Sequence, residues 1–346
     1  MFILCYFVEG KATIPKKRKR YAMSFLQSDN RKKVIFLGTP QVAALALKII
    51  LQYEHFLKVI LVVSQPPARS SRNGSETPSP VHTLALERGI PVFTPQSAKN
   101  PEFLSDLKEL KPDLCITAAY GNYLPKEFLD IPIFGTLNIH PSLLPLYRGA
   151  APVQRCIENG DEKTGVSILF SVAAMDAGPI LAQEEFSLND QIKSPELLEN
   201  LFEKGAKLLV KALPNYFAGL SKPIEQDHTQ ATKADKIKPE ESYLDFSKPA
   251  STLHNKVRAF SGWPGTKSIF LLNNDKIEIK IITTKVSQNN LGLKIGDLLF
   301  TQNTLSVCCG DDQLLDILEL QLPGKKAVSA KDFQNGVKGK LFKLNS

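Results

Sequence analysis

The chain has few cysteines and no long hydrophobic run, and each shortage excludes a class of protein. Its five cysteines in 346 residues include no C-x-x-C spacing. They indicate neither a disulfide framework nor a zinc site, so we predict a reducing compartment and no metal. The first apolar run, from Met1 to Val8, ends at Glu9 and is far too short to span a bilayer, so no membrane partner is expected.

The body of the chain also has little net charge. The net charge is +8, but residues 1–33 hold nine basic residues against two acidic ones and leave only +1 for everything after Lys33. The composition, 43% hydrophobic and 23% charged, is that of an ordinary soluble globular protein. A polyanionic partner is therefore expected to meet the ends of the chain.

Residues 1–30 are predicted to be an N-terminal extension. An apolar start is followed by a basic run at 16–20 and then by polar residues. A basic, acid-poor leader resembles an organelle transit peptide. Two alternatives stay open: a misassigned start, or a nuclear-type basic cluster that no receptor reads.

Glycine is missing where a dinucleotide-binding site would need it. An apolar run, Val34 to Leu37, leads into Gly38-Thr39-Pro40, and apolar residues then recur at helical spacing up to Ile50. This pattern predicts strand, tight turn and helix. The dinucleotide fingerprint needs three glycines in that turn, and only Gly38 is present, so a dehydrogenase is excluded.

The same strand-and-helix pattern recurs along the first two thirds of the chain. Apolar strands are predicted at 59–63 and 114–117, with a helix at 81–88 between them. Continuous apolar strands that alternate with helices indicate an α/β domain with a doubly wound, mostly parallel sheet, which we assign to residues 31–220.

A polar stretch at 221–241 is predicted to be a linker to a second domain. The short β-rich runs of residues 242–346, separated by Asn-, Gly- and Asp-rich turns, predict a C-terminal OB-like β-barrel. Two smaller interpretations concern this region: Trp263 is predicted to pack between domains, and Cys308-Cys309 to lie in a core.

The segment from Gly135 to Pro152 carries the strongest chemical signal. If 136–140 is a strand, its period of two places Asn138 and His140 on one face, and Pro141 ends it directly after them. Ligands of open α/β sheets bind at the carboxyl ends of strands. An amide donor beside an imidazole can polarise a carbonyl and manage a proton. The alternative is a structural, hydrogen-bonded histidine.

A second polar position follows another predicted strand. Asp176 lies in an Ala-Gly-Pro turn after the apolar run 166–172. An aspartate there could orient His140 and raise its basicity, or accept a proton itself. The alternative is that Asp176 only caps a turn.

These residues resemble a known family. The segment from Asn138 to Pro152, with Asp176 in its Met-Asp-Ala-Gly setting, is similar to the formyltransferases that use 10-formyltetrahydrofolate. Colinear motifs extend the resemblance to the methionyl-tRNA formyltransferases, over about Lys33 to Gly336. These motifs are at 36–40, 118–121, 124–125, 164–166, 231–232, 236–237, 253–260, 263–265, 324–326, 332–333 and 335–336. Shorter relatives that act on purine precursors lack the second domain.

The resemblance implies a Rossmann-like formyltransferase fold, an activity and roles for residues. Formyl would pass from 10-formyltetrahydrofolate to the α-amino group of methionine on initiator methionyl-tRNA. Asn138 and protonated His140 would stabilise the oxyanion, and Asp176 would keep His140 charged and help to move the amine's proton. The folate-contacting residues would be Ser142, Leu143, Leu144, Pro145, Tyr120 and Gly121.

The tRNA contacts implied by the resemblance are basic. Lys325 and Lys326 open a lysine-rich C-terminal stretch, and Lys/Arg contacts supply salt-sensitive affinity for a polyanion. In the family, the loop at 65–80 is usually basic and glycine-rich. Here Gly74-Ser75-Glu76 stands near where lysines are expected, and Arg72 is the candidate that reads the acceptor stem. We therefore expect weaker discrimination for initiator tRNA than is typical.

Two rival functions remain at this point, a formyltransferase acting on another amine such as an amino sugar, and a catalytically dead RNA-binding relative. We expect a monomer. Because initiator formylation belongs to bacterial-type translation, the leader suggests a mitochondrion or plastid. If residues 1–30 are spurious, a bacterial cytoplasm fits equally well.

Overall fold

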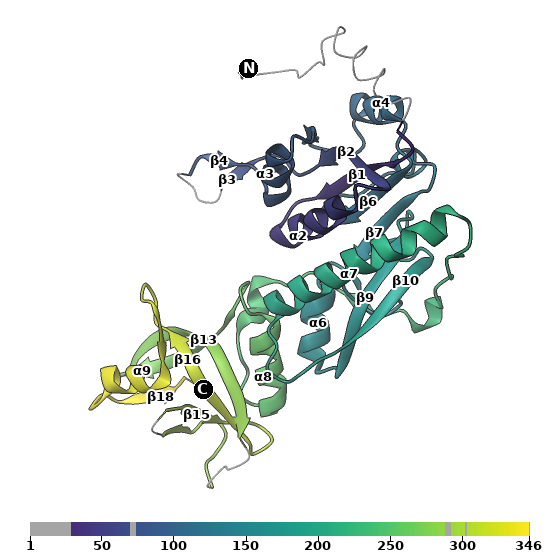
Figure 1. Ribbon diagram of the computed structural model, residues 1–346. Helices are drawn as coiled ribbons and strands as arrows, with labels where there is room; N and C mark the ends of the chain where they lie inside the picture. Colours follow the sequence, from purple (N-terminus) through teal and green to yellow (C-terminus); the bar gives the residue numbers. More distant parts are fainter. Residues whose placement is uncertain (1–28, 70–73, 288–291, 302, 346) are drawn as a thin grey trace.

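A computed structural model of the chain describes residues 29–69, 74–287, 292–301 and 303–345 (Figure 1). Most of the predicted extension and Arg72 therefore lie outside the described residues. Within these ranges, no helix combines the length and apolar character that crossing a membrane requires.

The first domain is built on a mixed sheet, which confirms the predicted α/β class. Five of its strands run parallel, and β9 and β10 add an antiparallel edge. Among the described residues, the strand order is β10 (Ile180–Ser187), β9 (Lys163–Phe170), β7 (Thr136–His140), β6 (Leu114–Ala118), β1 (Lys32–Gly38), β2 (Leu57–Val63) and β5 (Val92–Phe93).

Helices cover both faces of this sheet, as continuous apolar strands require. In β1, Val34 and Phe36 pack against α2 (Gln41–Ile50), α3 (Pro80–Glu87) and α7 (Ser194–Phe217). Ile35 and Leu37 point to the opposite core, with α4 (Pro101–Leu110) and α5 (Lys126–Leu129). Alternate residues of one strand thus fill two separate cores.

The C-terminal domain confirms the predicted β-barrel, since an antiparallel sheet curves until it nearly closes (Figure 1). Cys308 and Cys309 are fully buried, which confirms their predicted core position. This burial raises the pKa of the Cys309 thiol to about 12. The elements are β12 (Thr266–Leu272), β13 (Asp275–Ser287), β14 (Leu298–Phe300), β15 (Leu305–Cys308), β16 (Leu314–Gln321), β17 (Ala327–Ser329), α9 (Ala330–Val337) and β18 (Phe342–Leu344).

The segment at 221–241 lies along the first domain. Ile224 forms a bridge with Ile180, and Gln226 is buried. Further on, β11 (Lys233–Ala234) pairs in parallel with β8 (Arg148–Gly149), and the 3₁₀ turns η2 (His228–Gln230) and η3 (Pro239–Ser242) flank this pair. The polar composition therefore serves ordered contacts.

The two domains meet where α6 (Pro152–Asn159) lies beside α8 (Ala250–Ala259) (Figure 1). Ile157 of α6, Leu201 of α7 and Phe260 after α8 share one buried apolar cluster. Trp263 does not join it: its side chain is 55% exposed, so its assignment to domain packing was wrong. The aromatic residue buried in this cluster is Phe260, three positions earlier in the chain.

A buried histidine also joins the domains. The His254 Nε2 donates to the carbonyl of Asp190 at 2.7 Å, so its Nδ1 accepts from the Thr284 hydroxyl at 2.9 Å. Burial lowers the pKa of His254 below its ordinary 6.5; the hydrogen bond to the Asp190 carbonyl partly opposes this shift, and the nearby positive charge of Arg258 adds to it. The folded protein therefore holds a neutral ring.

This geometry predicts that acid destabilises the protein below pH 6.5. The unfolded chain takes up a proton on His254 that the folded chain does not bind, so the free energy of unfolding falls as pH drops from about 6.5, by up to about 1.4 kcal/mol per pH unit.

His254→Gln tests this prediction, because glutamine keeps a donor for Asp190 and cannot titrate. We expect the drop in Tm between pH 7 and 5.5 to be smaller in this variant. An equal drop in both proteins would contradict the assignment. Because burial also lowers the pKa of His82, only the difference between the two proteins counts.

Candidate active site

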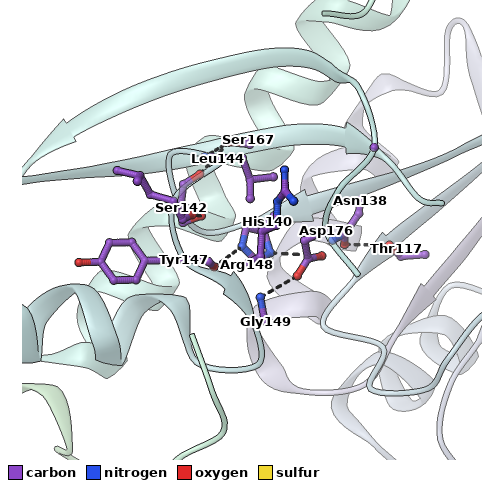
Figure 2. A network of polar contacts seen from close by, with 12 residues as sticks. Thr117, Asn138, His140, Ser142, Leu144, Tyr147, Arg148, Gly149, Ser167 and Asp176 are labelled. Atoms are coloured by element: carbon purple, nitrogen blue, oxygen red, sulfur yellow. Dashed lines mark hydrogen bonds and ion pairs between the residues drawn. The ribbon is translucent and has the colours of Figure 1, made fainter. Parts of the chain in front are cut away.

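Two side chains predicted to act together leave the same strand. Asn138 and His140 belong to β7, and Figure 2 shows them beside Asp176. The pairing of Thr117 with Asn138 aligns the carboxyl ends of β6 and β7 at this point. His140 is only 4% exposed, whereas Asn138 is partly exposed.

The amide of Asn138 is oriented by a neighbouring strand. The Thr117 hydroxyl of β6 donates to Asn138 Oδ1 at 2.8 Å (Figure 2). Within the described residues, no hydrogen bond occupies the amide nitrogen of Asn138. The NH₂ group is therefore free to donate to a ligand.

The ring of His140 is held by a backbone carbonyl. Its Nε2 lies 3.0 Å from the carbonyl oxygen of Tyr147, which can only accept, so Nε2 carries a proton. Tyr147 has φ of 61°, a left-handed conformation that is unfavourable for an aromatic residue and that surrounding contacts must maintain. Its hydroxyl donates to Asp161 and its backbone N–H to Thr232. Nδ1 is thus the nitrogen of His140 that is left for proton transfer.

The third predicted residue reaches the same point from another strand. Asp176 follows β9, with Oδ1 at 3.7 Å from His140 Nδ1 and Oδ2 accepting from the Gly149 N–H at 2.9 Å. Its φ of 50° is also left-handed. The structure therefore brings Asn138, His140 and Asp176 together, and when His140 is protonated its Nδ1–H faces a carboxylate.

The segment implied to contact folate is rigidly held next to His140. The Ser167 hydroxyl donates to Ser142 O at 2.7 Å and accepts from Leu144 N at 3.1 Å. Gln183 Nε2 donates to Leu144 O and to Ser167, and the Leu144–Pro145 peptide is cis. Leu143 packs on Gly165, where an added Cβ would lie 2.4 Å from its side chain.

Tyr120 and Gly121 lie at the carboxyl end of β6. The ring of Tyr120 is buried in the core behind the sheet, which raises the pKa of its phenol. Its carbonyl accepts from Thr39 Oγ1 and Gln65 Nε2. The side chain of Tyr120 is therefore turned into the core and its carbonyl is already engaged, whereas Gly121 is exposed.

The predicted tRNA-binding residues are not part of this cluster. Lys325 and Lys326 are exposed in the turn between β16 and β17 of the barrel. The frame of the loop at 65–80 is a hairpin of β3 (Ala68–Arg69) and β4 (Glu76–Thr77), which projects beside α3 in Figure 1. Arg69 lies 3.9 Å from Glu76 across it.

The structure adds residues that sequence reasoning missed. Thr117 had a detectable signal, because it is a hydroxyl residue in an otherwise apolar strand. Gln226, which donates to the carbonyls of Asp176 and Gly178, had no such signal, since it lies 50 residues from Asp176 in a polar segment.

Within the described ranges, His, Cys, Asp and Glu residues form no group of three or more that could hold a metal.

Comparison with known proteins settles the family. The formyl transferase family profile matches residues 32–213, and that of the formyl transferase C-terminal domain matches residues 236–338. The methionyl-tRNA formyltransferase of Roseiflexus castenholzii is 38% identical over 307 residues, covering 88% of this chain and 96% of the relative. The chain belongs to the methionyl-tRNA formyltransferase family. The Bacillus velezensis member is 36% identical over 304 residues, covering 88% and 94% of the two chains.

Solved structures share the fold of this family member at lower identity. An N-formyltransferase from Helicobacter canadensis, in complex with folinic acid and dTDP-3-aminofucose, has a TM-score of 0.62 at 18% identity, covering 83% of this chain and 98% of that one. HypX from Aquifex aeolicus, in complex with tetrahydrofolic acid, has a TM-score of 0.57 at 18% identity, covering 90% and 48%.

Proposed function

We propose that this family member transfers the formyl group of 10-formyltetrahydrofolate to the α-amino group of methionine on initiator methionyl-tRNA. The observation that carries the proposal is the convergence of Asn138, His140 and Asp176 at one sheet edge. The names of its relatives at 35–38% identity support the acceptor, and folate ligands in structures of the same fold support the donor.

The residues present fit the carbonyl chemistry of a formyl group. The unoccupied NH₂ of Asn138 can donate to the formyl oxygen, where negative charge develops as the amine attacks the formyl carbon. Thr117 fixes the direction of this donor before the substrate arrives, so little reorganisation is needed in the transition state.

His140 and Asp176 are placed to handle the proton that the amine must lose. With Nε2 bound to the Tyr147 carbonyl and Nδ1 facing Asp176, we propose the role of proton acceptor for His140 in place of the oxyanion donor that the resemblance implied: Nδ1 of the neutral ring can accept the amine's proton. Asp176, 3.7 Å away, stabilises the resulting imidazolium. The carbon–nitrogen bond to the folate then breaks, and the released nitrogen takes up a proton.

The exposed lysines of the barrel supply the proposed attraction for the tRNA. Lys325 and Lys326 are exposed, and among the described residues neither forms an ion pair, so their charge is available to a phosphate backbone. We propose that the protein acts as a monomer.

Formyl transfer in vitro tests this function. Purified protein is given 10-formyltetrahydrofolate and methionyl initiator tRNA, and the formylated product is measured. We expect turnover that Asn138→Ala abolishes. A parallel reaction with methionyl elongator tRNA measures discrimination, which the altered loop at 65–80 is expected to weaken.

Two controls make the result decisive. An amino-sugar nucleotide replaces the tRNA in one reaction, and turnover with it alone would contradict the proposed acceptor. Folate binding is measured in the absence of tRNA. Absence of both turnover and folate binding would contradict the proposed function altogether.

A further inference from the structure

The side chain of Gln226 is buried and uses its full hydrogen-bonding capacity beside the site. Its Nε2 donates to the carbonyl of Asp176 at 2.9 Å and to that of Gly178 at 2.7 Å. Its Oε1 accepts from Arg148 Nη2 at 2.6 Å and from Nε at 3.1 Å. One amide from the segment between the domains therefore connects the Asp176 turn to the strand that follows the His140 segment.

Backbone groups on either side of Gln226 share in holding the turn that carries Asp176: the Gly149 N–H donates to Asp176 Oδ2 at 2.9 Å, and the Ala177 N–H donates to the Ala174 carbonyl at 3.3 Å. Met175 is 71% exposed and Val172 is 41% exposed, so these two apolar side chains bury little surface against the turn. Asp176 itself has a φ of 50°, a left-handed conformation that aspartate adopts more readily than most residues but that still costs free energy. Such a conformation persists only where neighbouring contacts maintain it, and the two donations from Gln226 are contacts of that kind.

We propose that Gln226 is a positioning residue for the reaction: it sets the distance between the Asp176 carboxylate and His140 Nδ1. The inference rests on the proposed function and adds to it a residue from outside the formyltransferase sheet. Gln226 does not touch the reacting atoms. It acts through the backbone of Asp176, while the Gly149 N–H holds the carboxylate from the other side.

A substitution at Gln226 can remove the hydrogen-bond donor of its side chain and keep the acceptor. Gln226→Glu keeps an acceptor for Arg148 but replaces the donor with an oxygen, which repels the carbonyls of Asp176 and Gly178. Gln230→Glu makes the same change in charge at an exposed position of the same segment and is the matched control.

Steady-state formylation is measured for the wild type and both variants. We expect Gln226→Glu to lower kcat about 10- to 100-fold, because displacement of a reacting group by about 1 Å costs that much, and to leave the KM for 10-formyltetrahydrofolate within about twofold. Gln230→Glu should match the wild type. An unchanged kcat in Gln226→Glu, or a loss that appears only in KM, would overturn the proposal.

A double-mutant cycle separates positioning from a general structural role. If Gln226 acts through Asp176, then Gln226→Glu should cost little further activity in an Asp176→Asn background, whereas independent effects would multiply. Full multiplication would overturn the inference.

Hydrogen exchange gives a readout that does not depend on turnover. Amides at 172–178 should exchange faster in Gln226→Glu than in Gln230→Glu, and unchanged exchange would contradict the inference. Lack of formylation by the wild-type protein would reject the proposed function. Unchanged hydrogen exchange in Gln226→Glu would reject the positioning role, so the two failures can be told apart.

Discussion

Replacing His140 with alanine is expected to lower kcat for formyl transfer by about 10²-fold or more, the usual cost of losing a positioned acid–base group. His140 is 4% exposed, its Nε2 is bound to the Tyr147 carbonyl, and its Nδ1 faces Asp176 at 3.7 Å. Alanine removes the proton acceptor and leaves the Asp176 carboxylate without its imidazole. Single-turnover formylation with saturating substrates measures the chemical step directly.

The matched control is His55→Ala, since His55 is an exposed histidine outside the site. It should retain the wild-type rate. The Tm of each variant is measured in parallel to separate loss of chemistry from loss of folding. A change below about tenfold in folded His140→Ala would remove His140 from the mechanism.

Replacing Gly178 with alanine is expected to damage the site from two residues away. An added Cβ would lie 2.0 Å from the carbonyl oxygen of Phe170 and 3.1 Å from Val172 Cγ1. Because the nearest atom belongs to the backbone of β9, the turn itself must move. We expect a loss of about 1–3 kcal/mol in stability from overpacking. We also expect a fall in kcat of about 10²-fold, because Asp176 shifts from His140.

Gly336→Ala is the comparison for this prediction. Gly336 lies in α9, with no atom within 4 Å of an added Cβ, so its substitution should leave kcat at the wild-type value and leave Tm unchanged or slightly raised, because alanine favours the helix. Formylation kinetics and thermal unfolding check both variants. Wild-type kcat in Gly178→Ala would show that the position of the Asp176 turn does not limit the reaction.

The amino-acid sequence determined the helices and strands of the first domain, and it determined which polar residues lie at the carboxyl edge of its sheet. Both faces of β1 are buried, as expected for a strand in which apolar and polar residues do not alternate. The strand predicted at 136–140 is β7, with Asn138 and His140 at its end. These features depend on residues that are close in the chain, where strand periodicity and turn-forming residues act directly.

The tertiary structure decided how each of these side chains is aimed. Thr117, the carbonyl of Tyr147 and the amide of Gln226 orient Asn138, His140 and Asp176 in turn. Tyr147 has positive φ, which an aromatic residue type does not predict, and Asp176 has positive φ, which aspartate tolerates but does not by itself predict. Trp263 likewise stays exposed although its size favours burial. Such contacts join segments that are distant in the chain, and their geometry exists only once both segments are packed, so no local pattern encodes it.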